Sequence, residues 1–446
     1  MTCRSIFAAA SLAVSSVASA QVPTFQTDFT ADPAPTVHDD VVYLFTGHDE
    51  DETTEARFVM YDYLLFSSTD MVNWTHHGPA LNVGDVFAWS NGEAMAAQCI
   101  ERDGKWYFYV STGHTTSPGI AIGVAVADRP EGPYTDAIGE ALVTNNMTTQ
   151  AKHGWDDLDP SVFIDDDGRA FMYWGNNACY FAELGDDMIS LKSDITALSL
   201  DEETFGPDFE EAPWVYQRGE HYYLVYASGL PESIHYAMSD SPTGPWKYAG
   251  EVMDIQETTP ANHPGIFEFK GQPYLATQTD ALPGSHGKRR AVAIEPFEYN
   301  EDGTIPYIPW NDGVIESQGT INPREPVQGE TLAWAQGVEV ETLDSGERVV
   351  DDFDHADYVV IRAVDFGDRS PGEFVASLRS VTDKGTIDIR TGSVHGRLIG
   401  QVELGVTDGF EEVTTRLRET TGVHDVYLLY AGLEDDALAL DWWMVR

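Results

Sequence analysis

A β-hairpin is encoded by the stretch Leu158-Asp159-Pro160-Ser161-Val162-Phe163-Ile164-Asp165-Asp166-Asp167-Gly168 and by the aromatic strand that follows it up to Trp174. An Asp-Gly turn between two apolar strands is a strong short-range hairpin signal. The same arrangement occurs five times, with 52 to 64 residues between successive copies. The copies begin at Asp32, Ala96, Asp159, Glu211 and His263.

Repeats of this length are typical of propeller blades. A second hairpin follows most of the first ones, as in Phe66–Trp74 and Ser239–Trp246. Two hairpins make a four-stranded blade, so the sequence predicts an all-β fold with a five-bladed β-propeller over residues 21–312. A single β-sandwich is the alternative for this region, but it would not explain the repeats.

Three of the five blades begin with an acidic residue, namely Asp32, Asp159 and Glu211, and a fourth begins with His263. The first strand of each propeller blade lines the central axis, so these side chains are expected to converge on one pocket. Each Asp-Pro or Glu-Ala-Pro could also be only a strand-entry turn. Three acids in one register favour a functional site, because clustered like charges are costly unless a function uses them.

Paired carboxyl groups are what glycoside hydrolysis requires. One protonates the leaving oxygen, and the other activates a water molecule or attacks the anomeric carbon. Groups that face each other across a propeller axis suit the inverting reaction, whose carboxyl groups lie roughly 6.5–9.5 Å apart. A third acid can raise the pKa of the general acid by repulsion between like charges.

These motifs resemble the signatures of glycoside hydrolase family 43. The matching stretches are Ala31–Pro35, Leu158–Gly168, Glu211–Trp214, Asn262–Glu268 and Ala281–Gly284 with Arg289-Arg290. The resemblance implies a five-bladed propeller and an inverting hydrolase that needs no cofactor for catalysis. It assigns Asp32 as general base, Glu211 as general acid and Asp159 as the residue that modulates the pKa of the acid.

The resemblance also suggests substrate-binding residues. Either Arg289 or Arg290 is expected to reach the pocket, and strand parity leaves the choice open. His263 is a candidate to hold a hydrated cation at the axis, or is simply a hydrogen-bonded residue of the channel. The remaining candidates are Trp155 in a loop, Trp214 in a strand, and Met95 where relatives have an aromatic residue. Glu210 is expected to point away from the pocket, as the neighbour of Glu211 in an extended strand.

Residues 313–327 are predicted to be a linker, and residues 328–446 a β-sandwich of the jelly-roll type. This second part resembles carbohydrate-binding module family 6, which implies a structural Ca²⁺ held by Glu330, Glu341 and Asp441. Oxygen ligands of this kind are those that Ca²⁺ prefers. Tyr358 matches one aromatic residue of the family's sugar cleft, but Ala439 stands where the family has asparagine, so sugar binding and a purely stabilising role both remain open.

The chain has 446 residues, with 25 Lys and Arg against 74 Asp and Glu, and a formal net charge of −49. Such a charge argues against a nucleic-acid partner and against docking on anionic membranes. It indicates either solubility through self-repulsion or adaptation to high salt, where counterions screen the repulsion.

Residues 1–20 have the features of a signal peptide, with Arg4, an apolar run and a terminal Ala18-Ser19-Ala20. Cleavage before Gln21 would yield a secreted or periplasmic protein. In such a compartment Cys99 and Cys179 could form a disulfide, or remain buried thiols.

The sequence thus predicts a monomeric, exported hydrolase of plant-type polysaccharides or oligosaccharides, foremost an α-L-arabinofuranosidase acting on arabinoxylan. A β-xylosidase is the alternative within the same chemistry. A non-catalytic carbohydrate-binding propeller is the alternative from another class of function.

Overall fold

The computed structural model describes residues 21–148, 153–256, 258–310 and 313–446. The predicted signal peptide lies outside these residues. The described chain is almost entirely β-structure, with two four-residue helices, α1 (Val83–Val86) and α2 (Glu202–Phe205). Neither helix, nor any other helix among the described residues, has the length and apolarity to cross a membrane.

Residues 21–310 contain five antiparallel sheets, and the first strand of each contains one of the predicted repeat starts or begins two residues after it. The strands of the five sheets are, in turn, β1 (Thr30–His38), β2 (Val41–His48), β3 (Asp62–Ser68) and β4 (Trp74–Asn82); β5 (Ser90–Arg102), β6 (Lys105–His114), β7 (Ile120–Ala127), β8 (Thr135–Asp136) and β9 (Val143–Thr144); β10 (Ser161–Ile164), β11 (Ala170–Trp174), β12 (Tyr180–Glu183) and β13 (Thr196–Ala197); β14 (Glu211–Arg218), β15 (His221–Ser228), β16 (Ser233–Ser239) and β17 (Lys247–Met253); and β18 (Gly265–Phe269), β19 (Gln272–Thr279) and β20 (Ala291–Pro296).

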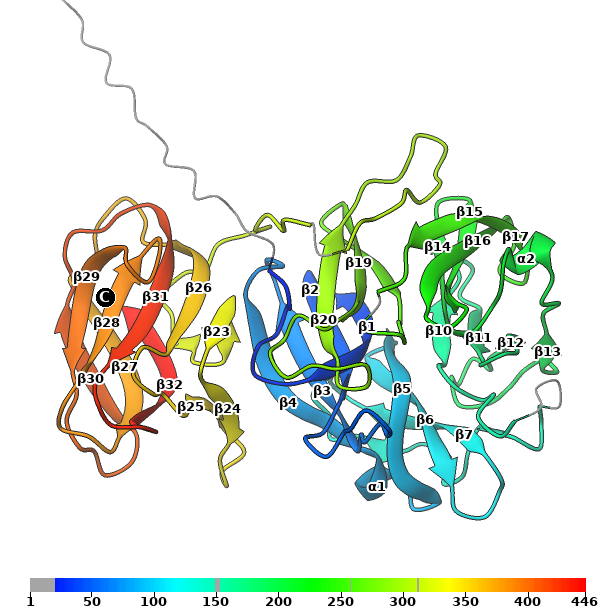
Figure 1. Cartoon of the computed structure of the whole chain (residues 1–446), viewed down its shortest axis with the longest axis horizontal. Coiled ribbons are helices and arrows are strands. Elements are labelled where there is room, and N and C mark those ends of the chain that lie inside the picture. Colours follow the sequence, from blue (N-terminus) through cyan, green and yellow to red (C-terminus); the bar gives the residue numbers. More distant parts are fainter. Residues whose placement is uncertain (1–20, 149–152, 257, 311–312) are drawn as a thin grey trace, which may run out of the picture.

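The first strands of these sheets contact one another in the order β1, β5, β10, β14, β18 and back to β1. The sheets therefore radiate from a common centre, as the blades of a propeller-like fold do (Figure 1). Aromatic side chains fill the space between neighbouring sheets. Phe45 of the first sheet packs on Phe108 of the second with ring centroids 5.1 Å apart, and Phe163 of the third packs on Tyr222 of the fourth at 6.1 Å.

The turns predicted between the first two strands of each sheet are present. In three of them both central residues have positive φ, as a type I′ hairpin turn requires. These turns are Asp39-Asp40, Asp103-Gly104 and Lys270-Gly271, and each joins two strands that pair directly on either side of it. Asp and Gly tolerate this left-handed conformation better than most residues, which is why the turns could be identified from the sequence.

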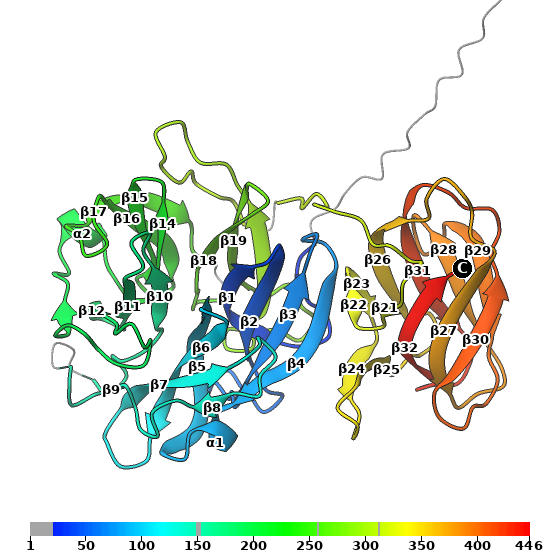
Figure 2. The same cartoon turned by 180° about the vertical axis from the view of Figure 1, so that it is seen from behind.

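The C-terminal part is a sandwich of two antiparallel sheets around one hydrophobic core, and it lies beside the first sheet of the propeller (Figures 1 and 2). One sheet contains β21 (Val327–Gln328), β24 (Glu339–Thr342), β25 (Arg348–Asp351), β27 (Glu373–Ser380), β30 (Glu411–Arg416) and β32 (Leu438–Val445); the other contains β23 (Trp334–Gln336), β26 (Tyr358–Asp365), β28 (Thr386–Thr391), β29 (Arg397–Glu403) and β31 (Val423–Ala431).

The two parts of the molecule share a sheet. β22 (Thr331–Leu332) pairs with β4 of the propeller, and β23 begins only two residues later and pairs with β26 of the sandwich. Across the same boundary, the Asn73 side chain accepts a hydrogen bond from the Arg362 amide at 2.8 Å and donates one to its carbonyl at 3.0 Å.

The segment predicted as a linker is packed rather than free. Ile315 is buried in a cluster with residues of the first and fifth sheets, and the Ile321 amide donates to the Ala363 carbonyl of the sandwich at 3.0 Å. The prediction of a linker was based on the Pro and Asn content of the segment, and composition carries no information about contacts with distant residues.

Cys99 and Cys179 are separate buried thiols in this structure, so of the two alternatives it has the free cysteines. Burial raises the pKa of both thiols, which makes them poor nucleophiles.

Candidate active site

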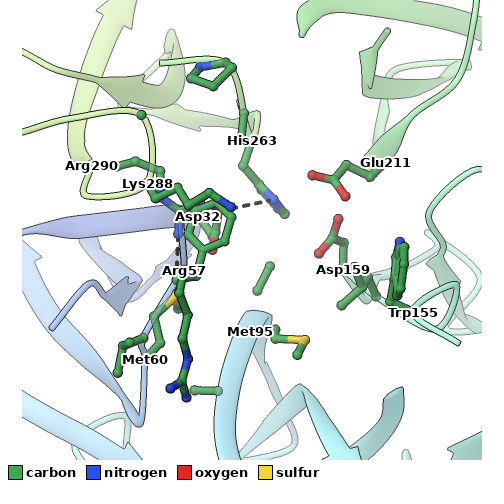
Figure 3. Close-up of a pocket in the computed structure, with 18 of the residues that line it drawn as sticks. Asp32, Arg57, Met60, Met95, Trp155, Asp159, Glu211, His263, Lys288 and Arg290 are labelled. Atoms are coloured by element: carbon green, nitrogen blue, oxygen red, sulfur yellow. Dashed lines mark hydrogen bonds and ion pairs between the residues drawn. The ribbon is translucent and has the colours of Figure 1, made fainter. Parts of the chain in front are cut away.

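A pocket of about 960 Å³ opens at the centre of the propeller-like part, where the first strands meet. Its lining includes seven residues that the sequence singled out, which come from distant stretches of the chain: Asp32, Met95, Trp155, Asp159, Glu211, His263 and Arg290. Figure 3 shows them around the pocket, with Asp159 and Glu211 on one side and Asp32 on the other, beside Arg290. The predicted convergence of the three acids is therefore present.

Backbone irregularities place these acids. Asp32 and Asp159 both have positive φ, at +48° and +58°. The pairing of β1 with β2 skips between Ala31 and Ala34, and that of β14 with β15 skips between Glu211 and Trp214. A β-bulge twists the strand and redirects a side chain. Positive φ in a non-glycine residue also costs energy and is concentrated at functional sites.

Asp32 is held by two donors. Its Oδ1 accepts hydrogen bonds from Gln278 Nε2 at 2.6 Å and from Arg290 Nη1 at 2.9 Å. Both bonds favour the negatively charged form of the carboxyl group. His263 lies on the same side, with Nδ1 3.8 Å from Asp32 Oδ1, and burial lowers the pKa of this histidine. A neutral imidazole is therefore the expected state of His263 at neutral pH.

Arg290 is itself fixed by Asp49. The guanidinium donates from Nε to Asp49 Oδ2 and from Nη2 to Asp49 Oδ1, both at 2.9 Å, in the bidentate arrangement that suits arginine and carboxylate. This decides the choice that the sequence left open. Arg290 enters the pocket, whereas Arg289 points away, where it donates to the Gly284 carbonyl and lies over the ring of Phe29.

Glu211 and Asp159 lie side by side at the pocket, where Asp159 is buried and Glu211 is half-buried (Figure 3). Asp159 Oδ2 accepts a hydrogen bond at 2.9 Å from the amide of Ala212, the residue that follows Glu211. Burial raises the pKa of Asp159 well above its usual range, and the charges of Glu211 and Asp32 add to this effect. Burial also raises the pKa of Glu211, against the opposing hydrogen bond that Asn176 Nδ2 donates to Glu211 Oε2 at 2.5 Å. Glu211 thus has the environment of a general acid.

The rim of the pocket presents exposed rings and cations. Trp155 is 55% exposed and stacks on His153 with ring centroids 4.7 Å apart. Phe58 is 39% exposed, and Lys288 Nζ lies 4.5 Å from the centre of its ring. An exposed aromatic face at the mouth of a polar pocket is suited to stacking on a sugar ring.

Two of the predicted positions were wrong. Trp214 is a core residue and does not line the pocket, because its side chain is 5% exposed and its Nε1 donates to the Ile266 carbonyl at 2.9 Å. Glu210 does line the pocket. Glu210 precedes the first residue of β14, so the alternation of side chains within a strand, on which the opposite expectation rested, does not apply to it.

Residues 21–305 match the model of glycosyl hydrolases family 43, and residues 328–446 match that of carbohydrate binding module family 6. The chain belongs to family 43. The protein is thus a glycoside hydrolase with a carbohydrate-binding module, and the alternative of a non-catalytic propeller is set aside.

Among curated family 43 proteins, the chain is 30% identical to an arabinoxylan arabinofuranohydrolase of Paenibacillus polymyxa, over 93% of this chain and 72% of the relative. It is 27% identical to a protein of the same name from Bacillus subtilis, over 99% and 95% of the two chains. The crystal structure of a Bacillus subtilis arabinoxylan arabinofuranohydrolase in complex with cellotetraose superimposes with a TM-score of 0.80, at 25% identity, over 96% of this chain and 98% of that one.

The calcium ligands expected in the module are only partly brought together. Glu330 is half-buried, and its buried Oε2 lacks a hydrogen-bond partner among the described residues. Burial, together with the charge of Asp441, raises its pKa to about 7. These two carboxyl groups suit a cation. Glu341 is exposed and lies near Asp351 instead. In the described part of the chain, a group of three possible metal ligands within 4.8 Å of one another is found elsewhere. It consists of His48, Glu50 and Asp62.

Several residues around the site were missed by sequence reasoning. Three of them bond to site residues from at or just beyond the end of the second strand of their sheet, namely Asp49, Asn176 and Gln278. The fourth, Glu232, lines the pocket from the turn between β15 and β16. In the C-terminal module, Tyr427 lies beside Tyr358 with ring centroids 6.1 Å apart and was also missed. No local pattern marks these residues, because their partners come from other parts of the chain.

Proposed function

We propose that the protein is an α-L-arabinofuranosidase that releases arabinose side groups from arabinoxylan with inversion of configuration. Asp32 takes a proton from a water molecule, whose oxygen forms the new bond to the anomeric carbon. Glu211 gives its proton to the departing glycosidic oxygen as the old bond breaks. Asp159, which hydrogen-bonds to the amide next to Glu211, positions the acid and helps to keep it protonated.

The observation that carries this proposal is the contrast between the surroundings of the two acids. Asp32 accepts hydrogen bonds from a guanidinium and a side-chain amide, whereas Glu211 is half-buried next to other carboxyl groups. Surroundings that favour a charged carboxylate at one site and a neutral acid at another assign the base and acid roles.

The β-xylosidase alternative is supported by other relatives. A xylosidase/arabinosidase of Humicola insolens is 29% identical to this chain. The match covers 62% of this chain and so does not extend over both of its parts. The arabinoxylan arabinofuranohydrolases match over both parts, which favours a branched polymer as substrate. The xylotriose complex of a β-xylosidase/α-arabinofuranosidase from a compost metagenome likewise covers 66% of this chain.

Two measurements test the proposal. Proton NMR of the sugar first released from a wheat arabinoxylan would show the inverted anomer, and net retention would refute the role of Asp32. Glu211→Ala is expected to lose activity on arabinoxylan and to keep much of it on 4-nitrophenyl arabinofuranoside, since a good leaving group needs little protonation. Full activity of Glu211→Ala on arabinoxylan would overturn the acid assignment.

We propose further that the five sheets are five blades of one propeller spanning residues 21–312, with the module from residue 328 onward. The ring of contacts among the first strands supports the blade count. We propose that residues 1–20 direct export and are cleaved before Gln21, so that the enzyme acts as a secreted or periplasmic monomer. N-terminal sequencing and light scattering of the exported protein test these points.

The module is proposed to bind Ca²⁺ through Glu330 and Asp441, which supports the sandwich rather than the reaction. Sugar binding by the module is proposed on the pair of Tyr358 and Tyr427. A cation at His263 is not part of this proposal, because the Arg290 guanidinium already supplies a positive charge to Asp32.

A further inference from the structure

The trio of His48, Glu50 and Asp62 lies at the base of a loop that lines the pocket. His48 is the last residue of β2 and Asp62 is the first residue of β3, one step beyond the paired residues Gly47 and Tyr63. Glu50 follows His48 by two residues, at the start of the loop. The hairpin therefore brings one imidazole and two carboxyl groups together where its two strands end.

Both carboxyl groups of the trio face the same nitrogen of the imidazole. Asp62 Oδ1 lies 3.0 Å from His48 Nδ1, and Glu50 Oε1 lies 3.8 Å from it. The three possible ligand atoms are all within 4.8 Å of one another. Two ligands of a tetrahedral Zn²⁺, each about 2.1 Å from the ion, are about 3.4 Å apart, so the spacing of these atoms suits one shared ion.

Another histidine of the same chain has a different arrangement. His38 lies between Asp39 and Glu101, at 3.3 Å from each, but Asp39 approaches Nε2 and Glu101 approaches Nδ1. The two acids thus lie at different edges of that ring and cannot share an ion with one of its nitrogens. The geometry of a metal site belongs to His48 and is not a general feature of histidines in this acidic protein.

The trio is half-buried and carries more negative than positive charge. The side chains of His48, Glu50 and Asp62 are 25%, 21% and 15% exposed, so water molecules can complete the coordination of an ion. Among the described residues, the ion pairs of Glu50 and Asp62 are with His48 and with no lysine or arginine. Two carboxylates against at most one imidazolium leave a negative charge, which a divalent cation would balance.

The loop of residues 49–61 connects the trio to the pocket. Met60, which Figure 3 shows at the pocket, belongs to this loop. So does Asp49, which directly follows His48 and holds Arg290 by two hydrogen bonds of 2.9 Å. An ion bound by the trio would tie the two ends of the loop together and fix the segment that carries Asp49.

We propose that His48, Glu50 and Asp62 form a site for Zn²⁺ that braces the loop of residues 49–61. An imidazole nitrogen beside carboxylates suits Zn²⁺, whereas Ca²⁺ takes oxygen ligands. The ion takes the place of the hydrogen on His48 Nδ1, which is released to the solvent as a proton. This role is structural, and it does not depend on the sugar or the linkage that the enzyme cleaves.

Isothermal titration calorimetry of the full two-part chain with zinc chloride tests the site. Saturating Ca²⁺ is present throughout, so that the site proposed in the module is filled. The wild type should bind one equivalent of Zn²⁺ that His48→Asn does not bind. Glu50→Gln keeps the contact between His48 and Asp62, and it should weaken the binding of that equivalent by about 10- to 100-fold.

His38→Asn is the matched control, because it removes a histidine that also lies between two acids. It should bind Zn²⁺ as the wild type does. Circular dichroism would establish that each variant is folded, and Glu50→Gln carries the test if His48→Asn unfolds.

Hydrogen exchange measures the bracing of the loop. At a free Zn²⁺ concentration about ten times the dissociation constant, exchange that requires release of the ion should slow about tenfold in residues 50–61 of the wild type. The same Zn²⁺ concentration should have little effect on this segment in Glu50→Gln.

The outcomes that would overturn the proposal are distinct. A wild type that binds no Zn²⁺, or that binds it no better than Glu50→Gln and His48→Asn, would show that the trio is an ion pair and not a metal site. Zn²⁺ binding that is lost in the variants but leaves the exchange of residues 50–61 unchanged would refute the bracing of the loop. None of these results bears on the roles of Asp32 and Glu211, which the anomer and leaving-group experiments test separately.

Discussion

Arg290 joins Asp32 to Asp49 across the floor of the pocket. One edge of its guanidinium binds Asp49 through two hydrogen bonds of 2.9 Å, and Nη1 reaches Asp32 Oδ1 at 2.9 Å. The proposed base is thus oriented by a cation that is itself oriented by a fully buried acid. Asp49 lies at the end of β2 and Arg290 before β20, so this arrangement depends on the closure of the ring between the first and fifth sheets.

Replacing Arg290 by lysine should lower kcat/KM on arabinoxylan oligosaccharides by about 100-fold. Lysine is a point charge and cannot hold both carboxylates at once. Steady-state kinetics would measure the loss, and Arg289→Lys is the matched control, since Arg289 points away from the pocket. Comparable losses in the two variants would contradict the assigned roles of these neighbours.

The two tryptophans should respond in opposite ways. Trp155→Ala is expected to raise KM about tenfold with no change in melting temperature, because the exposed ring offers a stacking face to sugar. Trp214→Phe should lower the melting temperature by several degrees and leave KM unchanged, because it loses a buried hydrogen bond in the core. A larger KM effect at Trp214 than at Trp155 would reverse this assignment.

Glu330 should make stability depend on pH and calcium. Its folded pKa of about 7 lies above the ordinary 4.5, so the stability it contributes is present below about pH 4.5 and is lost as the pH rises through 7. Without calcium, Glu330→Gln should therefore be more stable than the wild type at pH 8 and show no such advantage at pH 4. Thermal melts in EDTA measure the difference.

Added Ca²⁺ should raise the melting temperature of the wild type at pH 8 and leave that of Glu330→Gln unchanged. Glu325→Gln, which alters an exposed acid nearby, should behave as the wild type. A calcium response that survives in Glu330→Gln would place the ion elsewhere.

Asn73→Ala should loosen the contact between propeller and module. It removes both hydrogen bonds to the backbone of Arg362 and should cost about 2–3 kcal/mol of unfolding free energy. Calorimetry is expected to show one transition for the wild type and a resolved, earlier transition of the module in the variant. Asn300→Ala, in an exposed loop, should leave the single transition intact.

The hairpins and the three acids could be predicted from the sequence because their signals are local. Asp103-Gly104 and Lys270-Gly271 must adopt positive φ, and few residues do so readily. The repeat of such turns indicated where each sheet begins. Since the first strands of a propeller surround one axis, it also predicted that Asp32, Asp159 and Glu211 meet at one centre. Each of these steps requires only short-range rules and the geometry of a ring.

The partners of the acids could not be predicted in the same way. Asp49 and Arg290 are 241 residues apart, and Asn176 meets Glu211 only because two sheets pack together. Trp214 was wrongly assigned to the pocket because the bulge between Glu211 and Trp214 changes the direction of the side chain. The sequence shows an aromatic residue near an acid in a strand, but it does not show the bulge. The direction of a single side chain depends on packing that no local motif records.

The pairing of β22 with β4 bears on how this enzyme could be taken apart. A chain ending at residue 327 would lack Thr331 and Leu332 and so leave β4 as a bare edge strand, open to pairing with another molecule. Such a truncated hydrolase would be prone to self-association even with an intact pocket. Replacing the module by an unrelated domain would expose β4 in the same way, unless the new domain supplied a strand that pairs with β4.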